Sequence, residues 1–241
     1  MKQLKALVDL HTHTIVSGHA YSIWSENVKC ARKRGLQVLG ISEHAPMMPG
    51  SCGELYFTNF KVLPKYVGKM RVLNGIEANI LDFDGNIDVS EPVLSKVDYI
   101  IASLHSPCIK PGNVAQNTSA LIGAMRNPFV KIIGHPDDDR YPLDYEELTQ
   151  AATAEKVALE LNNSSLNPLS TRVNGEKNIR NLLEKCIDNH TMIIMGTDSH
   201  FCNDVGRFKE SCRILKELNF PREQIINEDI KRLPFVLNKS I

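Results

Sequence analysis

Short runs of apolar residues alternate along the chain with longer segments in which apolar residues recur every three or four positions. Most of the short runs are continuous stretches of Val, Ile and Leu, which is typical of strands that are covered on both faces. Their alternation with amphipathic helices predicts an α/β architecture with a parallel sheet. We expect seven strands, at Ala6–Leu10, Val38–Ser42, Val72–Ile76, Tyr99–Leu104, Val130–Gly134, Val157–Leu161 and Met192–Gly196.

Four of the intervening segments have the pattern of helices packed on a core. One carries Trp24, Val28 and Ala31 on a single face and closes with a basic turn and Gly35, and another begins at the capping residue Asp144. The other two have the apolar stripes Ile179, Leu182, Leu183, Cys186, Ile187 and Val205, Phe208, Cys212, Leu215, Leu218. Such strand–helix units form either a barrel or an open doubly wound sheet, and the pattern is compatible with both.

Composition favours a single soluble domain that spans residues 1–241, because no linker or charge block divides the chain. Lys plus Arg and Asp plus Glu are equal at 28 each, so no basic field favours nucleic acid as a partner. We find no targeting segment and no apolar run of the roughly 18 residues that cross a membrane. The six cysteines form no C-x-x-C pair, which indicates incidental thiols in a reducing cytoplasm.

Histidine is concentrated at the ends of the predicted strands. Seven of the eight histidines lie at or just after the carboxyl end of a strand, and only His190 lies in a helix-to-strand connection, where we expect an exposed side chain. The carboxyl ends of parallel strands form the active-site face of α/β folds. Together with one Glu and one Asp, the seven histidines make nine candidate metal ligands: His11, His13, His19, His44, Glu77, His105, His135, Asp198 and His200.

Residue spacing supports a metal centre. Side chains at i and i+2 of a strand point to the same side, so His11 can act with His13, and Asp198 with His200. Imidazole and carboxylate groups suit Zn²⁺, Mn²⁺ or Fe²⁺. Nine ligands are too many for one tetrahedral ion but suffice for two or three, whose charge would favour a dianionic phosphate. Asp9 is expected either to orient an imidazole or to serve in a strand-end turn.

The motifs Asp9-Leu10-His11-Thr12-His13-Thr14, Glu43-His44, Gly75-Ile76-Glu77, Ser103-Leu104-His105, Gly134-His135-Pro136 and Thr197-Asp198-Ser199-His200 resemble those of the PHP (polymerase and histidinol phosphatase) family. The runs His19-Ala20-Tyr21-Ser22 and Glu160-Leu161-Asn162-Asn163-Ser164-Ser165 are similar to those of its small stand-alone bacterial phosphatases of the YcdX type. The resemblance covers nearly the whole chain. It implies a distorted TIM-like (β/α)7 barrel with three divalent ions, usually zinc.

The resemblance also implies how the ligands divide among the ions. One ion is expected at His11, His13, Glu77 and Asp198, a second at Glu77, His105 and His135, and a third at His19, His44 and His200. Glu77, Asp198 and His200 are expected to take part in catalysis, in which a metal-activated hydroxide hydrolyses a small-molecule phosphomonoester. Four polar residues in or near strand-end loops are candidate phosphate contacts: Ser17, Ser106, Arg172 and Lys177.

Two other functions remain as alternatives. A metal-dependent nuclease or amidohydrolase can also carry His-x-His after the first strand, although such sites usually hold one or two metals. A non-catalytic metal-binding protein is the other alternative, although a full ligand set argues against it. Substrate choice is expected to lie in the rim loops 46–60 and 107–118. The sequence does not indicate the oligomeric state, because the exterior of the predicted barrel has no unique apolar stripe.

Overall fold

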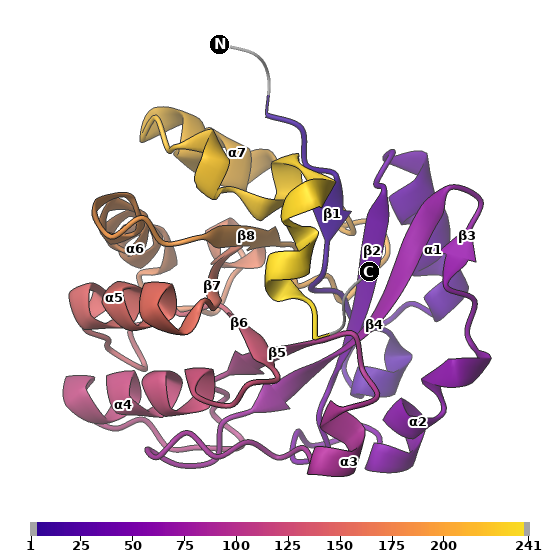
Figure 1. Cartoon of the computed structure of the whole chain (residues 1–241), viewed down its shortest axis with the longest axis horizontal. Helices are drawn as coiled ribbons and strands as arrows, with labels where there is room; N and C mark the ends of the chain where they lie inside the picture. The colour runs from indigo at the N-terminus through magenta and orange to yellow at the C-terminus, as the bar shows by residue number, and fades with distance from the viewer. Residues whose placement is uncertain (1–3, 239–241) are drawn as a thin grey trace.

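The strands form a nearly closed parallel barrel in the computed structural model, which describes residues 4–238 (Figure 1). Residues 1–3, which belong to the N-terminus predicted to carry no targeting segment, lie outside this range. The order around the barrel is β1-β2-β4-β5-β6-β7-β8. These strands are β1 Val8–Asp9, β2 Val38–His44, β4 Met70–Asn79, β5 Tyr99–Ser103, β6 Val130–Ile133, β7 Ala158–Asn162 and β8 Ile193–Gly196. The seven predicted strands and the TIM-like barrel are therefore confirmed.

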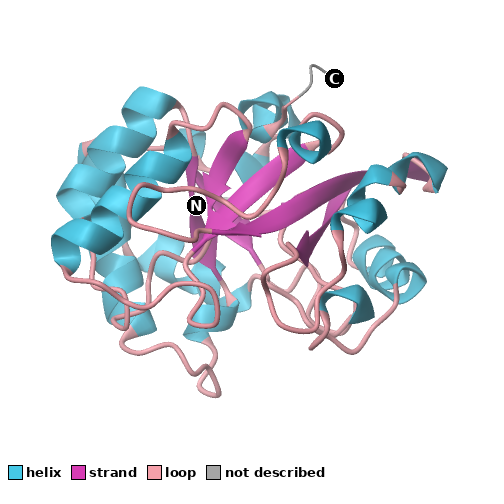
Figure 2. Cartoon of the chain, turned by 90° about the horizontal axis from the view of Figure 1, so that it is seen from below, coloured by secondary structure: helices cyan, strands magenta, loops and turns pink. Residues whose placement is uncertain are grey.

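The helices lie outside the strands (Figure 2). They are α1 Trp24–Lys33, α2 Glu54–Thr58, α3 Glu91–Leu94, α4 Val114–Met125, α5 Tyr145–Glu155, α6 Gly175–Asp188 and α7 Lys209–Glu217. The predicted helices at α1, α5 and α6 are confirmed, and the carboxylate of Asp144 caps α5. Helix α7 begins later than its stripe suggested, because Gly206 turns the chain at φ +72° between Val205 and Phe208. Within residues 4–238 no helix is both long and apolar enough to cross a bilayer.

Three elements correct the sequence prediction. Strand β3 (Tyr66–Val67) pairs antiparallel with β4 through a two-residue turn, in which Gly68 has the positive φ that such tight turns require. The rim-loop prediction is wrong from Val114 onward, because Asn113 and Gln116 form a capping box that starts α4. Helix α2 likewise replaces part of the predicted loop 46–60.

Two apolar clusters hold the barrel together. The larger lies between the strands and the surrounding helices, and the smaller fills the barrel interior. The interior cluster is closed at the amino ends of the strands by two 3-10 segments, Ile226–Glu228 and Ile230–Val236. Within the barrel the Tyr99 ring lies where Cβ atoms on Gly40 and Gly75 would be, 2.1 and 2.3 Å from its atoms. Both glycines are therefore needed for this close approach.

Side chains close the seam between β1 and β8. Backbone pairing there is limited, in the described chain, to a bridge between Thr12 and Ser199. The Asn227 amide donates to the Val8 and Met195 carbonyls, at 2.8 Å each. The Asp9 carboxylate accepts hydrogen bonds from the Thr197 backbone and hydroxyl and from the Gly206 N–H, at 3.2, 2.6 and 2.8 Å. The structure therefore supports the structural interpretation of Asp9, since the hydrogen bonds of its carboxylate go to Thr197 and Gly206.

Replacing Asp9 with Asn should destabilise the fold, because an amide would place a donor against the N–H groups that the carboxylate accepts from. We expect a loss of about 1–3 kcal/mol in the free energy of unfolding. Burial raises the pKa of Asp9 to about 6, so thermal unfolding should be measured at pH 8, where the wild-type carboxyl is ionised. Asp188→Asn, at an exposed position on α6, is the matched control. Equal melting temperatures for D9N and D188N would contradict this role.

Candidate metal centre

The carboxyl ends of the strands bring all nine predicted ligands to one end of the barrel. His11 and His13 follow β1, His44 ends β2, and Glu77 lies in β4, paired in register with His44. His19 follows the first 3-10 turn, Ile15–Ser17. The remaining ligands follow β5, β6 and β8, in the order His105, His135, Asp198 and His200. Within residues 4–238, four groups drawn from eight of these residues have ligand atoms within 4.8 Å of one another. His190 lies outside and is exposed, as predicted.

The first expected set consists of His11, His13, Glu77 and Asp198. Glu77 Oε2 lies 3.3 Å from His11 Nε2 and 3.4 Å from His13 Nε2, and Asp198 Oδ1 lies 3.6 and 3.3 Å from the same nitrogens. An ion held tetrahedrally at about 2.0–2.2 Å from each ligand separates its ligands by about 3.3–3.6 Å. His11 Nε2, His13 Nε2 and Glu77 Oε2 are also buried without a hydrogen-bond partner. These four contacts therefore have the spacing of ligands that share one metal ion, and the ligand atoms of His11, His13 and Asp198 all lie within 4.8 Å of one another.

The other oxygen of Glu77 faces a second set. Glu77 Oε1 lies 2.9 Å from His135 Nε2 and 3.2 Å from His105 Nε2, and it accepts a 2.7 Å hydrogen bond from Ser103 Oγ. The two oxygens of Glu77 therefore face two different groups of imidazoles. Burial by itself would raise the pKa of Glu77, but the imidazoles around it hold that pKa well below its usual value. The carboxylate is therefore ionised and can bridge two cations.

The third expected set is the most exposed. His19 Nε2 lies 3.0 Å from His200 Nε2, and the His19 and His44 rings are stacked at 4.9 Å. His44 also faces the first set, since its Nδ1 lies 2.8 Å from Glu77 Oε2. Burial and then the neighbouring His200 and His44 lower the pKa of His19 to about 4. Neutral imidazole is the form that binds metal, so this cluster is suited to a cation.

Four of the imidazoles are oriented by acceptors at Nδ1. When the ring donates from Nδ1, Nε2 is left without a proton and free to bind metal. The pairs are His11 with Glu160 Oε1 at 2.7 Å, His13 with Ser17 Oγ at 3.0 Å, His105 with Asn79 Oδ1 at 2.7 Å and His200 with the Asp198 carbonyl at 2.9 Å. The Nε2 atoms of His11 and His13 then face the first set, and that of His105 faces Glu77 Oε1.

Glu160, which the sequence analysis placed only within a family motif, contacts two of the candidate ligands. Its Oε1 accepts from His11, and its Oε2 accepts from the His135 backbone N–H at 2.8 Å. A Cβ on Gly196 would lie 1.8 Å from Glu160 Oε1, so glycine is required there for the carboxylate to reach His11. The available signal was its position on a strand two residues before Asn162, so that both side chains lie on the same face.

Ser17 occupies a different place from the one expected of a phosphate contact. Its side chain is fully buried, and its hydroxyl donates to Glu43 Oε2 at 2.5 Å. Ser17 Oγ also faces His13 Nδ1, at 3.0 Å, and accepts a hydrogen bond from the His44 backbone N–H at 3.1 Å. The Thr14 hydroxyl also donates to Glu43, at 2.6 Å. Ser17 and Glu43 therefore orient His13 from behind the ligand set.

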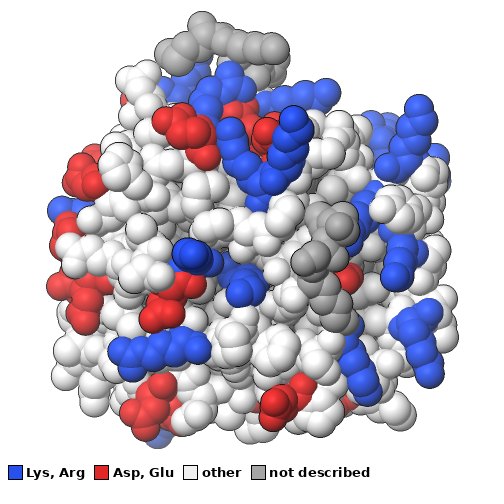
Figure 3. All heavy atoms as spheres, in the orientation of Figure 1, with Lys and Arg blue, Asp and Glu red and all other residues white. Residues whose placement is uncertain are grey.

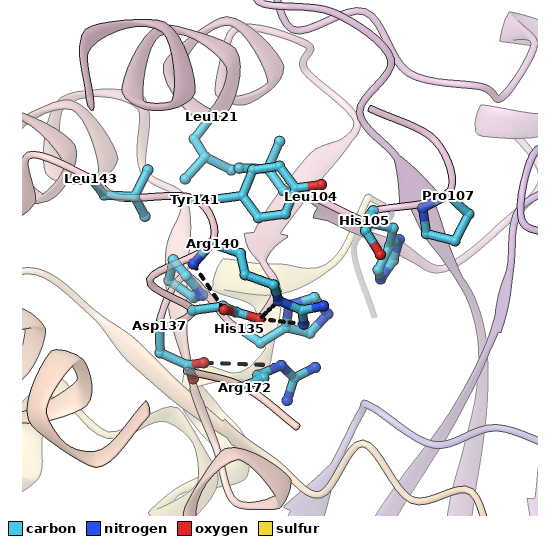
Figure 4. Close-up of a pocket in the computed structure, with 14 residues that line it drawn as sticks. Leu104, His105, Pro107, Leu121, His135, Asp137, Arg140, Tyr141, Leu143 and Arg172 are labelled. Carbon is cyan, nitrogen blue, oxygen red and sulfur yellow. Dashed lines mark hydrogen bonds and ion pairs between the residues drawn. The ribbon is translucent and has the colours of Figure 1, made fainter. Parts of the chain in front are cut away.

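A cavity of about 110 Å³ opens beside His105 and His135 (Figure 4). Ser106, Arg140 and Arg172 line it, whereas Lys177 is exposed on α6 and does not. Arg172 donates to Asp198 Oδ2 at 2.9 Å and to Ser165 Oγ at 2.8 Å. Arg140, which the sequence analysis missed, pairs with Asp138 in the loop after β6. The structure thus brings two of the four candidate phosphate contacts, Ser106 and Arg172, to this cavity, together with Arg140.

Two of the ligands have an unusual backbone. His135 has φ +29° and Asp198 has φ +50°, both in the left-handed region that side chains other than glycine rarely adopt. Each lies two residues beyond the end of its strand. Such conformations cost free energy and occur where the surrounding structure enforces them, often at functional sites.

Known proteins are similar to this chain in sequence and in fold. The chain is 44% identical over 238 residues to a probable phosphatase of Clostridium botulinum strain Hall, covering 98% of this chain and 97% of the relative. It is 41% identical over 230 residues to a probable phosphatase of Clostridium novyi, covering 95% and 93%. The barrel matches histidinol phosphate phosphatase from Lactococcus lactis, complexed with zinc, L-histidinol and phosphate, with a TM-score of 0.58 at 18% identity over 88% of this chain and 92% of that one.

A chain from an archaeal ribonuclease P also has this fold, with a TM-score of 0.58 at 16% identity over 95% of this chain and 90% of the other. The barrel alone therefore assigns no function. The model of the PHP domain matches residues 9–164, which include seven of the nine predicted ligands. With this match over most of its length and relatives above 40% identity, the chain belongs to the PHP domain family.

Proposed function

We propose that this PHP chain is a metal-dependent phosphatase that hydrolyses phosphomonoesters of small molecules. The observation that carries the proposal is the ligand set of His11, His13, Glu77 and Asp198, whose four nitrogen-to-oxygen contacts have the spacing of ligands that share one metal ion. The relatives named probable phosphatases support a phosphate ester as the substrate. So do the zinc and phosphate in the complex of the Lactococcus lactis neighbour.

Three divalent ions per chain are part of the proposal, with zinc as the best match to the donors. The groups contain only imidazole nitrogens and carboxylate oxygens, which suit Zn²⁺ and also Mn²⁺ or Fe²⁺. Glu77 presents one oxygen to each of two sets, which supports a pair of neighbouring ions. His19, His44 and His200 supply the donors for a third ion.

When bound, the ions would neutralise a phosphate dianion and make a water molecule acidic near neutral pH. The side chains of this protein keep that charge in place. Glu77 and Asp198 remain ionised, since the imidazoles and, for Asp198, also Arg172 offset the effect of burial on each pKa. Glu160, Ser17 and Asn79 fix the proton on Nδ1 of their imidazoles. The donor atoms are therefore preorganised before substrate enters.

The cavity beside the ligands favours a small substrate. Its volume of about 110 Å³ is lined by Arg140 and Arg172 as well as by apolar residues such as Leu104 and Leu143. The guanidinium groups would attract the phosphate ester, and Arg172 lies against Asp198 at the edge of the first ligand set. Ser106, next to His105, is placed to donate a hydrogen bond to a bound phosphate.

Glu77→Gln should remove the bridge between the first two sets. We expect zinc per chain, measured by elemental analysis, to fall from about three to one or fewer, and turnover of p-nitrophenyl phosphate to fall at least 100-fold. His190→Ala, which removes an exposed histidine outside the site, is the control and should retain both. Fully metallated wild-type protein without phosphatase activity would refute the proposal, as would faster cleavage of single-stranded DNA than of p-nitrophenyl phosphate.

Glu160→Ala should weaken metal binding. The effect is expected to act through His11, which Glu160 orients, and not through a contact with substrate. Loss of a carboxylate that orients a ligating histidine typically costs about 10–100-fold in metal affinity. Zinc affinity should be measured by competition with a chelator, and KM for p-nitrophenyl phosphate should be compared in zinc-saturated buffer. Exposed Glu184→Ala is the control. Equal zinc affinity in the two variants would remove Glu160 from the centre.

Arg172→Ala should raise KM for a phosphomonoester by about 10–100-fold, the usual effect of losing a charged hydrogen bond. Arg172→Lys keeps the charge but not the forked geometry, so its KM should lie between those of wild type and R172A. Lys177→Ala is the natural comparison, since Lys177 is exposed and lies outside the cavity. An unchanged KM in R172A would show that Arg172 does not bind phosphate.

A further inference from the structure

Two cysteines that are far apart in the sequence lie together beside the seam of the barrel. Cys30 is on α1, the helix that follows β1, and Cys202 lies in the loop that follows β8. Strands β1 and β8 are the two ends of the strand order, and the described backbone joins them through the isolated bridge between Thr12 and Ser199. A covalent bond between the two cysteines would therefore connect the first and last strand units across the seam.

Hydrogen bonds hold the loop after β8 against both ends of α1. The Cys202 backbone N–H donates to Ser22 Oγ at 2.9 Å, just before the helix begins. At the other end of the helix, the Arg34 guanidinium donates to the Val205 carbonyl at 2.5 Å and to the Asn203 carbonyl. Cys202 is therefore held beside α1 by contacts on either side of it.

Cys30 lies on the face of α1 that this loop covers. The Arg34 N–H donates to the Cys30 carbonyl at 3.1 Å, so the two residues are one helical turn apart and their side chains share a face. The thiols of Cys30 and Cys202 interact with each other directly. Both residues are half-buried, which leaves part of their surface open to a small oxidant. The two thiols are thus brought together by the fold itself.

The other four cysteines are placed differently. Burial is the largest cause of the raised pKa of each of their thiols, and the neighbours that act on them, among the described residues, are carboxylates, hydroxyls or backbone groups and not a second thiol. These cysteines are Cys52, Cys108, Cys186 and Cys212. A disulfide within the chain is therefore expected at Cys30 and Cys202 and not at the other thiols.

The surroundings of the pair are basic. Lys and Arg predominate at the right of the face in Figure 3, over the region where Figure 1 places α1. Burial and then the contact with Cys202 raise the pKa of Cys30, whereas Arg34 and Lys33 act in the opposite direction. The thiolate is the form that peroxide oxidises. The cations of α1 therefore offset part of the effect of burial and favour the reaction.

We propose that Cys30 and Cys202 form a redox site, at which hydrogen peroxide generates a disulfide that cross-links the seam of the barrel. Peroxide oxidises one thiol to a sulfenic acid and releases water. The second thiol attacks that sulfur, the S–S bond forms, the S–O bond breaks, and the hydroxyl leaves as water with the thiol proton. Two thiols and one hydrogen peroxide thus give one disulfide and two waters, with two electrons passing from sulfur to oxygen. The site does not depend on the proposed phosphatase activity.

The test is to treat the zinc-loaded protein with a small molar excess of hydrogen peroxide and then remove the peroxide with catalase. Titratable thiols in denaturant should fall from six per chain to four, since two of the six cysteines pair. Peptide mapping without reductant should recover Cys30 linked to Cys202. A disulfide that closes a long loop should raise the melting temperature by about 5–10 °C, and a phosphine reductant should reverse the rise.

Cys30→Ser and Cys202→Ser should each abolish both the linkage and the rise in melting temperature, so that either variant tests the site if the other fails to fold. Cys212→Ser, which removes a half-buried thiol on α7, is the control and should form the linkage like wild type.

Three results would overturn the proposal. One is a rise in melting temperature of the same size in C30S or C202S as in wild type. Another is oxidation of these two cysteines to sulfinic acids with no linkage between them. The third is a disulfide that joins two chains, seen as a dimer on a gel without reductant, in place of the linkage within one chain.

Discussion

The structure depends on one buried charge, the carboxylate of Glu77. Its side chain has no exposed surface, and six side-chain atoms approach its two oxygens within 3.4 Å: five imidazole nitrogens and the Ser103 hydroxyl. An ionised carboxylate is stable in such a place only when it is paired with positive charge. Imidazoles supply this charge only while they are protonated; imidazoles that bind metal are neutral, so the charge must then come from the ions, and Glu77 Oε2 has no hydrogen-bond partner. The arrangement is therefore complete only with cations between the carboxylate and the histidines.

This requirement explains several small residues around the barrel mouth. Glycine at 196 leaves room for Glu160 to reach His11, and glycine at 134 leaves room for the Ser103 hydroxyl, which would lie 2.2 Å from a Cβ there. Ser103 in turn donates to Glu77. Neither glycine has a positive φ, so both are required for space and not for backbone freedom. Packing at the carboxyl ends of the strands thus serves the ligands more than it serves apolar burial.

The strands and the clustering of the candidate ligands could be predicted because both follow simple rules. Strands covered on both faces are continuous apolar runs, and ligands follow the strand ends, so His11, His44 and His105 were recognisable from position alone. The residues that orient them were harder to predict. Glu160 occupies a strand position like many others, and Ser17 looks like an ordinary loop serine, because hydrogen-bond partners 149 or 26 residues apart leave no local pattern. The hairpin of β3 was missed because two residues are too few for a periodicity.

Without bound metal, the arrangement of the candidate ligands costs the protein free energy of folding. His135 and Asp198 adopt left-handed backbone conformations, and buried atoms of His11, His13 and Glu77 lack hydrogen-bond partners. A fold is only marginally stable, so these costs must be offset elsewhere. Part of the compensation is local, since Asp9 and Asn227 close the seam directly behind His11 with five hydrogen bonds to Thr197, Gly206, Val8 and Met195. The rest is expected from the ions themselves, because a ligand that binds only the folded state stabilises it by its binding free energy.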